Sequence, residues 1–271
     1  MSTIESNGVS LHVSDSGGDG RPVVLIHGWP QSGEAWAPQV PALTSAGYRV
    51  VTYDRRGFGD STAAGPYDYD TFAADLDAVM TGLDLRDATI LGFSMGGGEI
   101  ARYLGEYGSD RVRSAVLAAA IPPWLLKSDE NPDGGFPRDA AVGMQEQLLA
   151  DREGMLDGFM TGYFWAGGEL AVTEAQRQAA LALAAKADTE AAAACILAWL
   201  EDFTGDLEKI DVPVLVIHGD SDGIVPLEVS GARSAQLVSD GTLVVIAGGP
   251  HGINVSHTDE FNAALIDFLE R

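Results

Sequence analysis

The sequence predicts an α/β fold with a mostly parallel central sheet and helices on both faces. Its 271 residues fit one large domain with a well-buried core. Short β-rich segments alternate with helical stretches along the chain, as in a doubly wound sheet. Most of the β-rich segments are continuously apolar, which indicates strands that are buried on both faces.

The expected strands begin with an antiparallel N-terminal hairpin. Asn7-Gly8 suits a tight type I′ turn between the segment around Ile4 and the segment 9–13. Each of the later apolar runs predicts one strand, at 23–26, 50–53, 89–91, 115–117, 214–217 and 243–246.

Helices are expected between these strands, because apolar residues recur at helical spacing over 71–83, 96–107 and 260–269. No clear strand is expected between 122 and 205, where the alanine-rich run 179–194 predicts a single helix. We interpret this segment as a helical cap that roofs a pocket at the carboxyl edge of the sheet, where open α/β sheets bind ligands.

The predicted domain organisation follows from this interpretation. One domain spans 1–271, with a core at 1–121 and 206–271 and the cap at about 122–205.

The composition excludes several classes of protein. The net charge of −24, from 40 acidic and 16 basic residues, disfavours nucleic acid and anionic membranes as partners. The acidic surface is either a solubilising feature or an adaptation to high salt. No apolar run approaches the roughly 20 residues that span a bilayer. No signal peptide is recognisable, so a cytoplasmic location is expected. The oligomeric state stays open, with a homo-oligomer as one alternative.

The cysteine content bounds the redox and metal chemistry. Cys195 is the single cysteine, so an intrachain disulfide and a thiolate metal site are both excluded. Its position in an apolar helical run indicates an inert, packed thiol.

A nucleophile is indicated by Gly92-Phe93-Ser94-Met95-Gly96, which lies between a predicted strand and a predicted helix. This is the Gly-x-Ser-x-Gly elbow in the context that its chemistry requires, with small neighbours around a strained serine. Ser94 is therefore the expected nucleophile of a serine hydrolase.

A serine hydroxyl needs a base, and five histidines are available. His12 belongs to the N-terminal hairpin, and His257 lies beside the C-terminal helix. His27 and His218 end apolar strands and are interpreted as structural. His251 follows the last strand in a loop that can reach Ser94, so it is the expected base.

The base needs a carboxylate, and the loop after the strand 214–217 offers Asp220 and Asp222. Asp220 follows a glycine turn, where a side chain often caps backbone amides. Asp222 lies further out along the loop and is preferred. The order Ser94, Asp222, His251 then matches the catalytic-triad order of this type of elbow.

Two backbone amides are expected to form the oxyanion hole. Met95 N–H lies at the start of the helix after Ser94, and Gly28 lets the backbone of Trp29 approach the serine. The charged residues Asp54 and Arg55 are interpreted as structural hydrogen-bonding groups. The sequence contains no metal-binding motif.

Four motifs resemble one branch of a known family. The segments 27–30, 53–59, 92–99 and 249–252 together are similar to the α/β-hydrolase fold family, in its bacterial cofactor-free (non-haem) haloperoxidase, aryl esterase and γ-lactamase branch. The likeness spans nearly the whole chain. The family's His-Gly-Asp-x-Asp-x-Ile-Val-Pro motif is met by 218–226, which supports Asp222 as the acid.

The resemblance implies hydrolysis of small-molecule carboxylic esters through an acyl-enzyme, without a cofactor or metal. It also implies a promiscuous perhydrolase activity, in which hydrogen peroxide replaces water. The alternatives are a γ-lactamase or amidase, a hydroxynitrile lyase, and a non-catalytic binding scaffold. Ser94 argues against haloalkane dehalogenases and epoxide hydrolases, which use an aspartate nucleophile.

The substrate pocket is expected to be apolar, which favours small apolar or aromatic esters. The residues expected to line it are Trp29, Phe58, Met95, Trp124, Trp165, Trp199 and Ile224.

Overall fold

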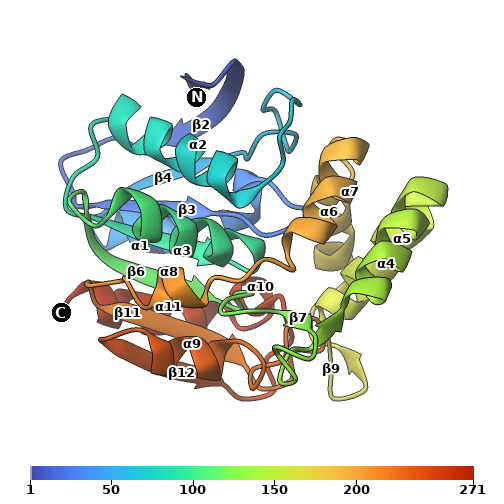
Figure 1. Cartoon of the computed structure of the whole chain (residues 1–271). Coiled ribbons are helices and arrows are strands. Elements are labelled where there is room, and N and C mark those ends of the chain that lie inside the picture. The colour runs from blue at the N-terminus through green and yellow to red at the C-terminus, as the bar shows by residue number, and fades with distance from the viewer. Residues whose placement is uncertain (1) are drawn as a thin grey trace.

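An eight-stranded sheet runs through the protein (Figure 1), and the computed structural model describes residues 2–271. The strand order is β1-β2-β4-β3-β5-β6-β11-β12. The first two strands pair antiparallel and the other pairings are parallel, apart from the antiparallel pairing of β2 with β4. The strands of this sheet are β1 Ser2–Ser6, β2 Val9–Asp15, β3 Pro22–Ile26, β4 Arg49–Tyr53, β5 Ala88–Phe93, β6 Val112–Ala118, β11 Val214–Gly219 and β12 Gly241–Ile246. The predicted fold class is confirmed.

The turn of the N-terminal hairpin has the predicted chemistry. Asn7 and Gly8 have φ angles of 45° and 82°, so both central residues are left-handed, as a type I′ turn requires. The pairing of Ile4 with Leu11 then fixes the register of the hairpin at the sheet edge.

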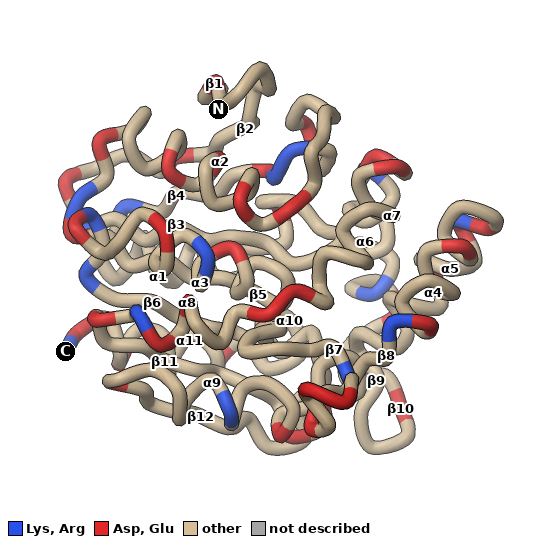
Figure 2. The backbone as a smooth tube through the Cα atoms, in the orientation of Figure 1, with Lys and Arg blue, Asp and Glu red and all other residues tan. Residues whose placement is uncertain are grey.

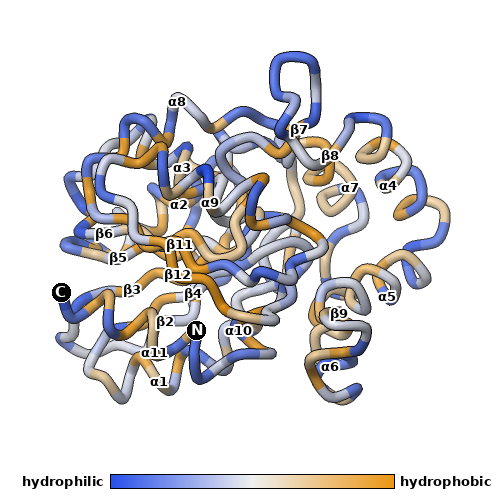
Figure 3. Tube along the Cα trace, turned by 90° about the horizontal axis from the view of Figure 1, so that it is seen from below, coloured by the Kyte–Doolittle hydropathy of each residue, from blue (hydrophilic) through white to orange (hydrophobic). Residues whose placement is uncertain are grey.

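Helices cover both faces of the sheet. One face packs against α2 (Tyr69–Gly82), α3 (Met95–Tyr107) and α9 (Gly231–Leu237), and the other against α1 (Val40–Ser45) and α11 (Thr258–Leu269). The alternation of β3 makes both cores possible, because Val24 and Ile26 enter one and Val23 and Leu25 enter the other. Figure 3 shows hydrophobic residues concentrated in the region of β3, β11 and β12. The shorter helices of the core are η1 Gly33–Trp36, α8 Thr204–Leu207 and α10 Ile253–Ser256.

The last strand differs from its prediction. The continuous apolar run 243–246 predicts burial on both faces, but β12 is the edge strand, with Leu243 and Val245 38% and 45% exposed. The run therefore pairs through one edge only, and its apolar character alone could not distinguish an edge strand from a central one.

The insertion between β6 and β11 is mostly helical and lies to one side of the sheet in Figure 1. Its helices are α4 Arg138–Ala150, α5 Arg152–Tyr163, α6 Glu174–Ala184 and α7 Thr189–Ala198. It also contains two short strand pairs that the sequence did not predict. They are β7 Leu126–Lys127 with β8 Phe136–Pro137, and β9 Trp165–Ala166 with β10 Glu169–Leu170.

The prediction of a single helix over 179–194 is wrong, because the helix is interrupted between α6 and α7. The side chain of Asp188 accepts a hydrogen bond from Ala191 N and so starts a new helix as an N-cap. The amide of Asp188 donates to Gly57 O at 2.7 Å, which ties this break to the core.

Acidic residues are scattered over many helices and loops (Figure 2). Within residues 2–271, none of the helices combines the length and the apolar character that crossing a bilayer requires.

Candidate active site

Ser94 occupies a strained turn between β5 and α3. Its φ of 53° is unusual for a residue with a side chain, and such a conformation costs on the order of 1–3 kcal/mol. A Cβ on Gly92 would lie 2.2 Å from Gly96 O, and a Cβ on Gly96 would lie 2.7 Å from Ile26 O. Both glycines are therefore required for α3 to turn back closely against the sheet.

Ser94, His251 and Asp222 form a continuous hydrogen-bonded chain. His251 Nε2 lies 3.0 Å from Ser94 Oγ, and His251 Nδ1 lies 2.7 Å from Asp222 Oδ2. All three side chains are buried. They come from the elbow after β5, the loop after β11 and the loop after β12, which meet at the carboxyl edge of the parallel strands.

The carboxylate of Asp222 is held by its own loop. The amides of Ile224 and Val225 donate to Oδ1 at 2.9 and 2.8 Å, and His218 Nε2 lies 3.3 Å from Oδ2. Burial acts to raise the pKa of Asp222, but the nearby His251 and His218 outweigh it and hold the pKa below its usual range. The group is therefore an anion beside His251.

The His251 imidazole is completely buried and packs against two aromatic rings. Its ring centroid lies 5.3 Å from that of Phe93 and 5.0 Å from that of Tyr163, in edge-to-face geometry. Gly252 N donates to Tyr163 O at 2.9 Å, which fixes the loop as well as the ring. Tyr163 was not predictable as a neighbour of His251, because it lies in the insertion, far from His251 along the chain.

The alternative carboxylate, Asp220, has a different role. Its Oδ1 accepts a hydrogen bond from Gly248 N at 2.7 Å, so it joins two loops by capping a backbone amide. This is the local role expected for a side chain directly after the Gly219 turn.

The loop after β3 lies directly against Ser94. A Cβ on Gly28 would be 3.1 Å from Ser94 Cβ, so only glycine allows this approach without displacement. His27 Nδ1 lies 2.8 Å from Gly28 O, and Arg55 N donates to His27 Nε2 at 3.0 Å. Burial, followed by the charge of Arg55, lowers the pKa of His27 well below its usual value. His27 is therefore a neutral structural residue.

Arg55 also holds the loop after β3 in place. It is fully buried, forms an ion pair with Glu99 at 2.7 Å, and donates to His27 O at 3.0 Å. These contacts agree with its interpretation as a structural hydrogen-bonding group.

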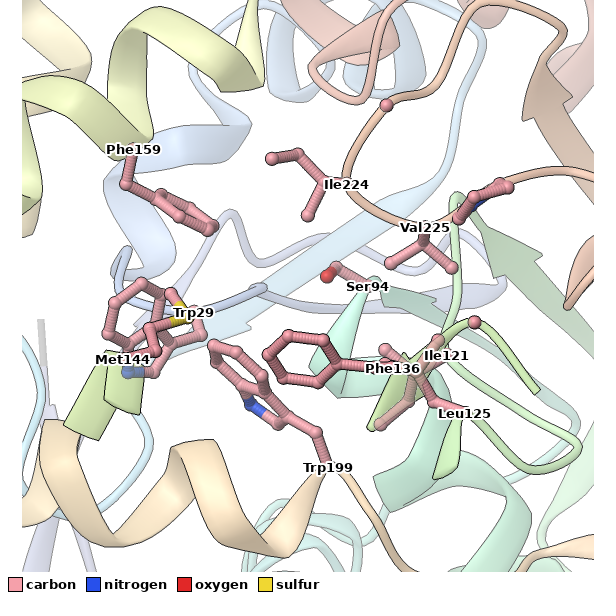
Figure 4. A pocket seen from close by; sticks show the side chains of 13 residues that line it. Trp29, Ser94, Ile121, Leu125, Phe136, Met144, Phe159, Trp199, Ile224 and Val225 are labelled. Carbon is pink, nitrogen blue, oxygen red and sulfur yellow. The ribbon is translucent and has the colours of Figure 1, made fainter. Parts of the chain in front are cut away.

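A cavity of about 270 Å³ opens onto Ser94 (Figure 4). None of the described residues that line it carries a charge. Its walls are formed by Trp29, Ile121, Leu125, Gly135, Phe136, Met144, Phe159, Trp199, Gly223, Ile224, Val225 and Pro226. Three of the residues that were expected to line the pocket do line this cavity: Trp29, Trp199 and Ile224.

Four expected wall residues do not line this cavity. Phe58 is fully buried and its ring packs near His27 and Arg55. The Met95 side chain is buried in the hydrophobic core. Trp124 donates its indole N–H to Leu200 O. Trp165 is 48% exposed on the β9–β10 hairpin, because the adjacent Phe164 takes the buried position.

One group of side chains has the composition of a metal site. His12, Asp54 and Asp60 offer ligand atoms within 4.8 Å of one another, and none of them lines the cavity at Ser94. Asp54 already accepts hydrogen bonds from Gly33 N and Asp60 N at 2.7 and 2.8 Å, and its Oδ2 lies 3.2 Å from His12 Nδ1. Those contacts account for the cluster without an ion.

Comparison with known proteins matches residues 21–258 to the model of the alpha/beta hydrolase fold. The chain belongs to the α/β-hydrolase fold family. This α/β hydrolase is 44% identical to a non-heme chloroperoxidase of Kitasatospora aureofaciens, over 98% of each chain. It is 37% identical to a bifunctional esterase/perhydrolase of Acinetobacter calcoaceticus, over 97% of each.

A solved structure is similar over the whole α/β hydrolase. The bromoperoxidase of Bacillus anthracis superposes with a TM-score of 0.97 at 44% identity, covering 100% of this chain and 99% of that one. The family resemblance expected from the four motifs is confirmed.

Proposed function

We propose that this α/β hydrolase cleaves small carboxylic esters through an acyl-enzyme on Ser94. The observation that carries the proposal is the hydrogen-bonded chain from Asp222 through His251 to Ser94, which ends in an apolar cavity. The similarity to a bifunctional esterase/perhydrolase supports the same class of reaction.

Acylation follows from the contacts of the three side chains. Asp222 accepts a hydrogen bond from His251 Nδ1–H, which leaves Nε2 free to take the proton of Ser94 as Oγ attacks the ester carbonyl. The anionic Asp222 stabilises the imidazolium that results. His251 then returns the proton to the departing alcohol, and the acyl group stays on Ser94.

The developing oxyanion is bound by the amides of Met95 and Trp29 in this proposal. Met95 is the first residue of α3, so its N–H lies among the free amides of a helix N-terminus. The close approach of Gly28 to Ser94 supports Trp29 N–H as the second donor. Fixed donors of this kind stabilise the transition state without reorganisation.

Deacylation needs an acceptor that His251 can deprotonate. Water gives the carboxylic acid and restores the Ser94 hydroxyl. Hydrogen peroxide in the place of water gives a peracid, and the chloroperoxidase and perhydrolase names of two relatives support this branch. Both branches use the same triad and require no cofactor.

The cavity favours small apolar or aromatic acyl groups. Its volume of about 270 Å³ and its aromatic walls suit a short chain or a single ring. A carboxylate on the substrate would lose its hydration there without gaining a partner, so charged acyl groups are disfavoured. The cytoplasmic location and a homo-oligomeric state stay predictions.

The proposal is tested by p-nitrophenyl acetate and butyrate hydrolysis by the wild type and S94A, with peracid formation measured in acetate and hydrogen peroxide. We expect S94A to lose several orders of magnitude in kcat. The control is S109A, just beyond the C-terminal end of α3, where the hydroxyl donates to Asp211. Equal rates for the wild type and S94A would refute a role for Ser94 in catalysis.

A further inference from the structure

A thioether shares the cavity with the Ser94 hydroxyl (Figure 4). The sequence has six methionines, and Met1 lies outside the described residues. Within residues 2–271, Met80, Met95, Met155 and Met160 are buried and do not line the cavity. Met144 is half-buried and lines it.

The position of Met144 is fixed by helix packing. Ala141 and Leu148, which lie one turn before and one turn after it on the same face of α4, are fully buried. The next residue, Gln145, donates from Nε2 to Ala193 O on α7 at 2.9 Å. These contacts fix the part of α4 that carries Met144 and so place its side chain in the wall of the cavity that Ser94 also lines.

We propose that Met144 is a site of oxidative self-modification by the peracid that this enzyme makes. The proposal rests on the peroxide branch of the proposed function. The terminal peroxy oxygen forms a bond to Met144 Sδ while the O–O bond breaks, and the peroxy proton moves to the departing carboxylate. Sulfur loses two electrons and becomes a sulfoxide, and the peracid is reduced to its carboxylic acid.

Other oxidisable groups are less favourable targets. Cys195 does not line the cavity, and burial raises the pKa of its thiol to about 12, so a reactive thiolate does not form. The indoles of Trp29 and Trp199 do line the cavity, but a thioether is the softer nucleophile. Oxidation is therefore expected at Met144 before either indole.

A sulfoxide at this position would change the enzyme. It replaces an apolar wall with a strong hydrogen-bond acceptor in a cavity whose described wall residues offer no charged partner. Binding of apolar acyl groups should weaken, so KM for a butyrate ester should rise more than kcat falls. Each turnover that forms a peracid can then oxidise Met144 and so lower the rate of later turnovers.

The test compares the wild type, S94A and M144L in acetate and hydrogen peroxide, with excess free methionine to consume released peracid. Peptide mass mapping then locates any added oxygen atom. We expect sulfoxide at Met144 in the wild type, in proportion to turnover, and none above background in S94A. Leucine conserves the volume of methionine, so M144L should keep a larger share of its own initial esterase activity than the wild type does.

The outcomes separate this inference from the proposed function. Peracid formation with an unmodified Met144 overturns the self-modification and leaves the proposed function intact. Equal oxidation in the wild type and S94A assigns the chemistry to bulk peroxide and overturns it too. Ester hydrolysis without any peracid overturns both the peroxide branch and the self-modification. A wild type that neither forms peracid nor hydrolyses the ester refutes the proposed function itself.

Discussion

The Asp222 carboxylate is surrounded by N–H donors on both oxygens. Two loop amides contact Oδ1, and His251 and His218 contact Oδ2. Hydrogen bonds to the charged form of a carboxylate stabilise that form. A single side chain therefore orients His251 and also stabilises the loop 222–225 on which it lies.

Replacement of this anion should reduce the rate far more than it disturbs the fold. We expect D222N to lower kcat by about 10⁴-fold, because an amide cannot stabilise the imidazolium or enforce its tautomer. The control is D220N in the same loop, which removes a charge that does not contact His251. The measurement is p-nitrophenyl acetate turnover with circular dichroism of each variant, and equal losses in the two variants would contradict the assignment.

The depressed pKa of Asp222 also makes a prediction about stability. A carboxyl whose pKa is lower in the folded state stabilises the fold above its unfolded pKa of about 3.9, and that contribution disappears as the pH falls. The difference in free energy of unfolding between the wild type and D222N should therefore be constant from about pH 7 to about pH 5 and shrink below about pH 4. Denaturant titrations at several pH values measure it. A difference that persists unchanged into strong acid would count against an ionised Asp222.

Glycine positions give a matched pair of stability predictions. G92A places a methyl group 2.2 Å from the backbone oxygen of Gly96. We therefore expect the free energy of unfolding to fall by about 3 kcal/mol or more, and activity to be lost as well. G143A lies on the exposed surface of α4 with no atom within 4 Å of the new methyl, so we expect a gain of about 0.5–1 kcal/mol. Urea unfolding tests both. Tolerance of G92A would mean that the elbow can relax.

At the scale of elements, the core was largely predictable from the sequence. The apolar runs placed the strands of the core correctly, because burial of a strand leaves a direct imprint on its composition. The meeting of Ser94, Asp222 and His251 was predictable because strand ends converge at one edge of a parallel sheet. The interpretation of 243–246 was right in predicting a strand and wrong in predicting burial on both faces, because β12 lies at one edge of the sheet.

The insertion was much less predictable, for a physical reason. An apolar side chain in a helix has the same signature whether it fills a core or lines a cavity, so Phe136, Met144 and Phe159 gave no separate signal. Trp165 illustrates the converse error, since its neighbour Phe164 is the buried one. The break at Asp188 depends on a single N-cap inside an alanine-rich run.

Tyr163, at the C-terminal end of α5, is predicted to support catalysis by positioning His251. Y163A removes the ring that packs against His251, and we expect kcat to fall by on the order of 10²-fold through misplacement of the base, with a smaller change in KM. Y163F keeps the ring and should stay close to the wild type. Steady-state kinetics of the two variants decide this, and a loss in Y163F would instead point to the hydroxyl.

At the scale of the whole molecule, the net charge of −24 predicts a strong effect of salt on stability. Raising potassium chloride from about 0.01 M to about 1 M shortens the Debye length from about 30 Å to about 3 Å, which screens the self-repulsion. We expect Tm to rise over this range at pH 7. The rise should be smaller near pH 5, closer to the pI of about 4.2. Thermal melts measure both.

The same melts address the origin of the acidic surface. A rise that levels off once repulsion is screened indicates a solubilising surface. A continued rise well above 1 M would favour adaptation to high salt. A flat response at all concentrations would contradict both readings of the charge.

The proposed catalytic residues and much of the cavity wall lie on different stretches of the chain. Ser94, Asp222 and His251 belong to the sheet and its loops, whereas Phe136, Met144, Phe159 and Trp199 belong to the insertion. During evolution, substitutions in the insertion can therefore change the substrate of such an enzyme while its reaction stays the same. A mutational library confined to 122–205 that leaves Tyr163 unchanged would therefore change substrate preference while keeping the proposed catalytic residues, and a tree built from that interval should group relatives by substrate rather than by reaction.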